Sequence, residues 1–258
     1  MVRPPPPAPA ARCVALGASN LTRALATWVA AARVAAGGPV DCIIAAGNGR
    51  SFGARSRFLG RELPGILQSS VFDRLTGPRR GWGAVLDVGN DLLYGAEVDT
   101  VLSWVETCVT TLARHVEHLA IGGLPPVAQG TITPFRFELV RRVLVPSCRL
   151  GLEEAVAAAC DLEDGLRALA RKHGAAFVDM PGHYYGTDPI HVRARHRAEL
   201  CARLLGTLPD EVRACPLRVG EAARVRLARP ARESIWGVPR CGTPPQLRLR
   251  DGTTLTLD

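Results

Sequence analysis

Four short motifs, far apart in the sequence, carry polar side chains of types that take part in catalysis. Ser19 follows one apolar run, the glycine loop 47–49 follows a second, Asn90 follows a third, and Asp188 precedes His191 by three residues. A hydroxyl, an imidazole oriented by a carboxylate, and amide donors are the groups that form and stabilise an acyl-enzyme. Together these residues predict a serine nucleophile, a general base and an oxyanion pocket.

Ser19 and Asn90 each have a simpler interpretation when taken alone. Serine is a preferred cap for the N-terminus of a helix, and asparagine often shapes a turn. In combination with His191 they favour catalysis. The backbone N–H groups of Ser19 and Gly49 and the side-chain amide of Asn90 would then point at a developing negative oxygen.

The general base has two candidate pairs. Asp188 lies three residues before His191, a spacing that lets the carboxylate reach Nδ1 and leaves Nε2 to face the serine. Asp179 and His183 are separated by one residue more and lie closer to the end of a predicted strand. Both pairs remain open on residue types alone.

The elements that must position these residues alternate along the chain. The sequence predicts strands over residues 12–16, 40–46, 83–88, 119–121 and 175–179 and helices over 20–36, 97–119, 135–144, 153–173 and 191–205. Strands that alternate with helices predict a parallel sheet with both faces covered. In such sheets active sites gather at the carboxyl ends of the strands, which is where the four motifs fall.

The two ends of the chain differ from this pattern. We expect a disordered Pro/Ala-rich tail over 1–11, a catalytic domain over 12–208 and a small β-rich extension over 209–258. Asp251-Gly252 lies between alternating apolar runs, which predicts a hairpin over 246–257.

Composition narrows the class of protein. Hydrophobic residues make up 47% of the 258 positions, enough for one packed α/β domain with an extension. The formal charge is +8, but Lys172 is the only lysine and the arginines are spread along the chain. We therefore expect no nucleic-acid partner. The eight cysteines contain no Cys-x-x-Cys pair, and no signal peptide or membrane span is evident, which predicts reduced thiols in a cytoplasmic protein.

The ordered motifs resemble those of the SGNH hydrolase superfamily, the GDSL-like esterases and lipases. The resemblance implies a flavodoxin-like three-layer sandwich with a mainly five-stranded parallel sheet over residues 12–208. It makes Ser19 the nucleophile and favours Asp188 and His191, since the family carries an Asp-x-x-His motif. Ser19, Gly49 and Asn90 would form the oxyanion hole, with Gly47 or Arg50 as alternative backbone donors to Gly49.

The chain departs from the family pattern at two positions. Ala18 stands where the family usually has an aspartate, and Val88 stands where it usually has a glycine. Arg23 and Arg50 lie near the motifs, where they could bind an anionic group of the substrate or be solvated surface charges.

We therefore expect an ester hydrolase that acts through an acyl-enzyme on a small ester or acetylated substrate, without a metal or organic cofactor. Its activity should fall below about pH 6, where histidine side chains gain a proton. The alternatives are a non-catalytic binding or regulatory protein with the same fold, and an acyltransferase that uses the same nucleophile. The sequence specifies no oligomeric state.

Overall fold

The computed structural model describes residues 9–77, 80–125, 148 and 150–258. Residues 1–8 of the predicted tail and the predicted helix over 135–144 lie outside these ranges. The strands predicted from the sequence are all present, and each differs from its predicted bounds by three residues or fewer: β1 (Ala11–Leu16), β2 (Val40–Ala45), β5 (Arg80–Val85), β6 (His118–Gly122) and β7 (Ala176–Val178).

These five strands form a continuous parallel run within a seven-stranded sheet. Their order in the sheet is β2-β1-β5-β6-β7, and every neighbouring pair among them is parallel. Numbered along the chain, this is the order 2-1-3-4-5 of a flavodoxin-like doubly wound sheet. The predicted α/β fold class is confirmed, and the strand order reverses beside β1, whose end leads to Ser19.

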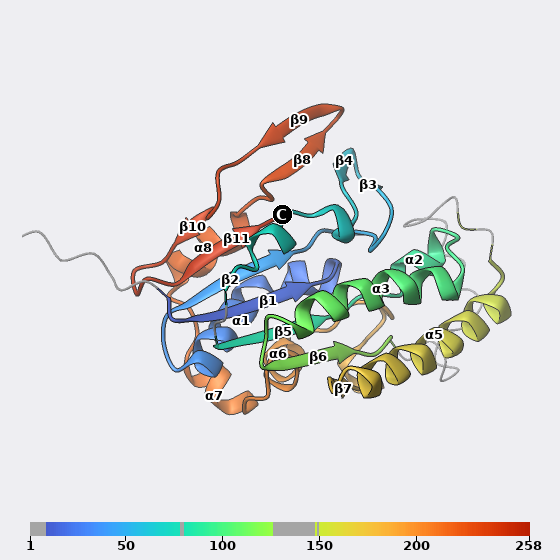
Figure 1. Cartoon of the computed structure of the whole chain (residues 1–258), viewed down its shortest axis with the longest axis horizontal. Helices are drawn as coiled ribbons and strands as arrows, with labels where there is room; N and C mark the ends of the chain where they lie inside the picture. Colours follow the sequence, from blue (N-terminus) through green and yellow to red (C-terminus); the bar gives the residue numbers. More distant parts are fainter. Residues whose placement is uncertain (1–8, 78–79, 126–147, 149) are drawn as a thin grey trace, which may run out of the picture.

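Helices cover both faces of this sheet (Figure 1). One face carries α1 (Ser19–Ala36), α6 (Arg197–Leu205), α7 (Pro209–Ala214) and α8 (Val219–Leu227), and the other carries α3 (Val98–Ala113) and α5 (Leu152–Lys172). Each face has its own buried apolar cluster. The three layers therefore hold the carboxyl ends of the strands, and the loops that follow them, at one edge.

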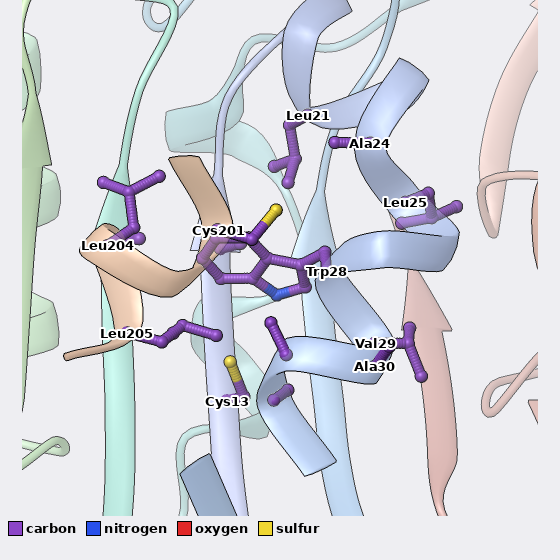
Figure 2. Packing of buried hydrophobic residues seen from close by; sticks show 14 of the residues in the cluster. Cys13, Leu21, Ala24, Leu25, Trp28, Val29, Ala30, Cys201, Leu204 and Leu205 are labelled. Carbon is purple, nitrogen blue, oxygen red and sulfur yellow. The ribbon is translucent and has the colours of Figure 1, made fainter. Parts of the chain in front are cut away.

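Trp28 anchors α1 against the sheet. Its side chain is fully buried, and Figure 2 shows it between α1 and α6, with Cys201 and Leu205 on one side and Cys13 of β1 beneath. Burial of an aromatic side chain of this size is a large contribution to core stability. This packing fixes the helix whose first residue is Ser19.

The chain from residue 209 onward begins with two helices that we did not predict, and the strands of the expected β-rich extension follow from residue 232. Residues 209–214 and 219–227 are the helices α7 and α8, which pack on α1. Pro209 and Asp210 suit the first turn of a helix, and the apolar residues Val212, Ala222 and Val225 are buried. Burial of these apolar side chains therefore favours helix within a segment that we expected to be β-rich.

The predicted hairpin over 246–257 is present as β10 (Leu247–Arg248) and β11 (Thr254–Leu257). It extends the central sheet, because β11 pairs in parallel with β2. A second, four-stranded sheet joins two distant segments in the order β3-β4-β8-β9, with bounds β3 (Ser56–Phe58), β4 (Arg61–Leu63), β8 (Arg232–Ile235) and β9 (Val238–Cys241). The last strand, β11, therefore lies beside β2, the strand that leads into the glycine loop.

Two predicted helices are shorter in the structure. The helix expected over 97–119 ends at Ala113, where the chain turns towards β6, and the helix expected from residue 191 begins at Arg197 after a short 3-10 turn. His191 therefore lies in a loop. None of the eight cysteines, all of them described, is in a disulfide. No helix in the described part of the chain has the length and apolar character needed to cross a membrane.

Candidate active site

Ser19 lies at the first residue of α1, directly after the carboxyl end of β1. The turn between them is tight: the Gly17 N–H donates to the Ala45 carbonyl at 3.0 Å, and a Cβ on Gly17 would lie 3.1 Å from the Leu86 side chain. Amides at a helix N-terminus have no acceptor within the helix, so they can bind an anion. The turn thus presents both a half-buried hydroxyl and a backbone donor.

The structure brings Ser19, His191 and Asp188 together in one hydrogen-bonded chain. His191 Nε2 lies 3.0 Å from Ser19 Oγ, and His191 Nδ1 lies 2.7 Å from Asp188 Oδ2. Because a carboxylate only accepts, Nδ1 carries the proton and Nε2 is left to accept the serine O–H. This is the tautomer that a general base requires.

Asp188 is held in turn by its own loop. Its Oδ1 accepts the N–H groups of Ile190 and His191 at 3.1 and 3.2 Å, and Arg23 lies 3.7 Å from its Oδ2. The Arg23 side chain is 45% exposed and that of His191 is only 10% exposed. Arg23 therefore pairs with the carboxylate beside the base while remaining open to solvent.

The rival pair, Asp179 and His183, is not part of this arrangement. Asp179 accepts a hydrogen bond from Arg167 at 2.7 Å, and the His183 ring packs edge-on against Tyr184 and His196. The structure thus places His191, together with Asp188, against Ser19, and it pairs Asp179 and His183 with other side chains.

Two of the predicted oxyanion donors, Gly49 and Asn90, lie on segments that one buried carboxylate joins. Asn90 begins the short helix α2 (Asn90–Leu93), and its Nδ2 is buried with no hydrogen-bond acceptor among the described residues. The next residue, Asp91, accepts the Ser51 hydroxyl and the Phe52 N–H of the glycine loop. Burial raises the pKa of Asp91, although these two bonds oppose the shift. Asp91 thus ties the loop of Gly49 to the turn of Asn90.

Gly49 suits its place in this loop better than any other residue. Its φ is +66°, in the left-handed region, and an added Cβ would lie 2.6 Å from Tyr94 Oη. The Tyr94 hydroxyl donates to the Gly49 carbonyl at 2.6 Å, and burial raises the pKa of Tyr94 to about 12. The N–H of the alternative donor Arg50 is already bonded to the Gly47 carbonyl at 3.2 Å, which disfavours it for the oxyanion role.

The expectation that the Arg50 side chain binds substrate or is a surface charge is wrong. Arg50 is fully buried, donates to the Pro64 carbonyl at 3.0 Å, and donates to the backbone oxygen of Asp258. Burial lowers its pKa to about 10. Its role is to fasten the loop after β2 to the last strand, which sequence alone could not show because its partners lie far along the chain.

Asp87 is a residue that the sequence interpretation missed. Its Oδ2 accepts the N–H groups of Ala18, Asn20 and Leu21 at 2.9, 3.0 and 3.2 Å, so it caps α1 in place of Ala18, which has no side-chain oxygen. Its φ is +64°, which costs about 1–2 kcal/mol for an L residue and is tolerated best by Asn and Asp. The signal in the sequence was a single acid inside the apolar run 83–88.

One group of side chains in the described part of the chain has the spacing of metal ligands. Ligand atoms of His183, His196 and Glu199 lie within 4.8 Å of one another. Arg195 Nε donates to His196 Nε2 at 3.0 Å, and His196 Nδ1 lies 3.4 Å from Glu199. Both ring nitrogens of His196 therefore already have hydrogen-bond partners, which leaves neither for a metal ion.

In comparisons with family models and with curated proteins, none matches this chain. Solved structures of similar fold include the aryl esterase of M. Smegmatis, at 17% identity over 79% of this chain and 99% of that one, with a TM-score of 0.47. TesA aligns at 12% identity over 78% of this chain and 99% of its own, with a TM-score of 0.48. A member of the lipolytic protein G-D-S-L family from Veillonella parvula DSM 2008 aligns at 12% identity over 76% and 97%, with a TM-score of 0.47. At such identities and scores, the activity of this chain is inferred from its own side chains.

Proposed function

We propose that the protein is a serine ester hydrolase that acts through an acyl-enzyme on small esters or acetylated compounds. The observation that carries the proposal is the chain from Ser19 through His191 to Asp188, with contacts of 3.0 and 2.7 Å. These distances lie within the range in which a base can take a proton from a nucleophile.

In the first half of the reaction, His191 Nε2 accepts the proton as Ser19 Oγ bonds to the ester carbonyl carbon. The carbonyl oxygen becomes an oxyanion, which the N–H groups of Ser19 and Gly49 and the Nδ2 of Asn90 would stabilise. When the C–O bond to the alcohol breaks, imidazolium His191 returns the proton to the leaving oxygen. Asp188 stabilises the imidazolium between these two transfers.

In the second half, water takes the place of the alcohol. His191 removes a proton from water as its oxygen bonds to the acyl carbon, and the same donors stabilise the second oxyanion. Collapse of this intermediate releases the acid and returns the proton to Ser19 Oγ. The buried and unpartnered Nδ2 of Asn90 supports a donor at this place, since buried amides without acceptors are rare in native proteins.

The test is covalent labelling with a fluorophosphonate probe, combined with hydrolysis of short p-nitrophenyl esters. We expect one adduct, located at Ser19 by peptide mass spectrometry, and loss of both labelling and hydrolysis in Ser19→Ala. Ser103→Ala, which changes an exposed serine of α3, is the matched control and should keep both. Absence of labelling and hydrolysis in the folded wild-type protein would leave a non-catalytic binding protein. Release of acyl products only onto an added alcohol would indicate an acyltransferase.

A further inference from the structure

The loop that carries Asp188 and His191 is fastened to α1 through its main chain by one side chain. Residues 185–193, all of them described, belong to no helix or strand. Asn20 Nδ2 donates to the Ile190 carbonyl at 3.0 Å, and Asn20 Oδ1 accepts the Val192 N–H at 2.8 Å. Asn20 therefore holds the backbone on both sides of His191.

The same side chain is oriented by Asp87. The second Nδ2 hydrogen of Asn20 is donated to Asp87 Oδ1 at 2.8 Å, while Asp87 Oδ2 accepts the backbone N–H of Asn20 at 3.0 Å. Both amide hydrogens and the carbonyl oxygen of Asn20 are thus used, so only one orientation of this amide satisfies all its partners.

We propose that Asn20 and Asp87 are positioning residues for the reaction, forming an Asn20–Asp87 bridge that sets the His191 imidazole against the Ser19 hydroxyl. The inference rests on the proposed hydrolase function, because it assigns the bridge a role in that proton transfer. Asn20 follows the nucleophile in the chain, and its two contacts flank the base. The bridge therefore links the helix that carries the nucleophile to the loop that carries the base.

The chemistry of the bridge requires an asparagine. An aspartate at position 20 could still accept the Val192 N–H, but its other oxygen would face the Ile190 carbonyl and the Asp87 carboxylate, which are both acceptors. An alanine would lose all three bonds and leave the loop tied to α1 by the His191–Ser19 bond and the 3.7 Å contact of Arg23 with Asp188. Since a misplacement of about 1 Å can cost about 100-fold in rate, the bridge matters for kcat.

Asp87 also explains why the chain tolerates Ala18. Its carboxylate supplies the first turn of α1 with the acceptor that Ala18 lacks, and it does so from the end of β5 rather than from the nucleophile turn itself. One carboxylate thereby fixes both the helix start that presents Ser19 and the amide that holds the base loop.

The test compares Asn20→Ala and Asn20→Asp with Thr22→Val. The Thr22 hydroxyl also forms a hydrogen bond in the first turn of α1, to the Ala18 carbonyl at 2.8 Å. It makes no hydrogen bond to residues 190–192, which are all described, so Thr22→Val serves as the matched control. We expect kcat for a p-nitrophenyl ester to fall about 10- to 100-fold in both Asn20 variants. KM should stay within about threefold, because the loss lies in proton transfer rather than in binding. Thr22→Val should keep kcat within about threefold.

A second measurement is independent of activity. Amide hydrogen exchange of Val192 by NMR should become at least about tenfold faster in Asn20→Ala and stay unchanged in Thr22→Val. Wild-type kcat retained in Asn20→Ala, a loss confined to KM, or an equal loss of kcat in Thr22→Val would overturn the proposal. If the wild-type protein is neither labelled nor active, the hydrolase function fails, and the exchange result alone decides whether the bridge holds the loop. Unchanged Val192 exchange in Asn20→Ala would then refute it.

Discussion

Replacement of Asp188 by asparagine should reduce activity more than replacement by alanine. Asp188 Oδ1 accepts two backbone N–H groups, from Ile190 and His191, at 3.1 and 3.2 Å. An asparagine at 188 must place its oxygen there, because its NH2 group would face two donors. The NH2 group then points at His191 Nδ1 and stabilises the tautomer with the proton on Nε2. That imidazole cannot accept the proton of Ser19.

The magnitudes follow from the bonds involved. Alanine at 188 removes a charge-assisted hydrogen bond worth about 1.5–3 kcal/mol, which corresponds to about a 10- to 150-fold loss in kcat. Asparagine adds the opposite bias of a neutral bond, about 0.5–1.5 kcal/mol, which brings the loss to about 30- to 2000-fold. The half-exposed Asp188 side chain places both effects towards the lower ends of these ranges.

The assay is steady-state hydrolysis of a p-nitrophenyl ester at pH 8, with Asp179→Asn as the matched control. Asp179 is an exposed aspartate that pairs with Arg167 and makes no hydrogen bond to Ser19 or His191, which are both described, so its amide variant should keep full activity. An Asp188→Asn variant as active as Asp188→Ala would refute the reasoning on the tautomer. Full activity in both Asp188 variants would remove Asp188 from the mechanism.

Three further outcomes are expected. Trp28→Phe should lower the free energy of unfolding by about 1–3 kcal/mol, less than the 3–5 of full truncation, with kcat/KM unchanged, as measured by urea titration at constant m. Burial opposes ionisation of Asp258, but the hydrogen bonds from Arg232 and Ser70 hold its pKa below the ordinary value. The ionised carboxylate therefore stabilises the fold at pH values above its unfolded pKa, and this stabilisation is lost as the pH falls through the folded pKa. At pH 7 the free energy of unfolding of Asp258→Asn, measured by urea titration, should therefore be about 1–2 kcal/mol lower than that of the wild type. Between about pH 4 and pH 2 the variant should lose less stability than the wild type. Gly49→Ala should reduce kcat/KM roughly 10- to 100-fold because its Cβ would collide with Tyr94 Oη, whereas Gly37→Ala, with a similar φ of +68° and no atom nearby, should lose only stability.

Sequence alone predicted the order of the five core strands of the parallel sheet and the residues of the candidate site. The strand ends are marked by apolar runs that stop at Ser19, the glycine loop and Asn90, and parallel strands bring such ends to one edge. The Asp188–His191 contact could be predicted as well, because a spacing of three residues is a local geometry. These are short-range patterns, which one sequence can carry.

Only the tertiary structure decided how the parts are held. Asn20 is 67 residues from Asp87 and 170 residues from Ile190 in the chain. Nothing in the sequence around one of these residues indicates that it contacts another. The sequence left open whether Arg50 binds an anionic group of the substrate or is a surface charge, and neither holds because Pro64 and Asp258 accept its hydrogen bonds in the buried interior.

The segment 209–227 was misjudged for the same physical reason. Its helices gain most of their stability by burying Val212, Ala222 and Val225 against α1, rather than from intrinsic propensity. Contacts between residues that are close in the chain, such as Asp188 and His191, can be predicted from the sequence. Contacts between buried groups that are distant in the chain are decided only by how the sheet and its two layers of helices pack.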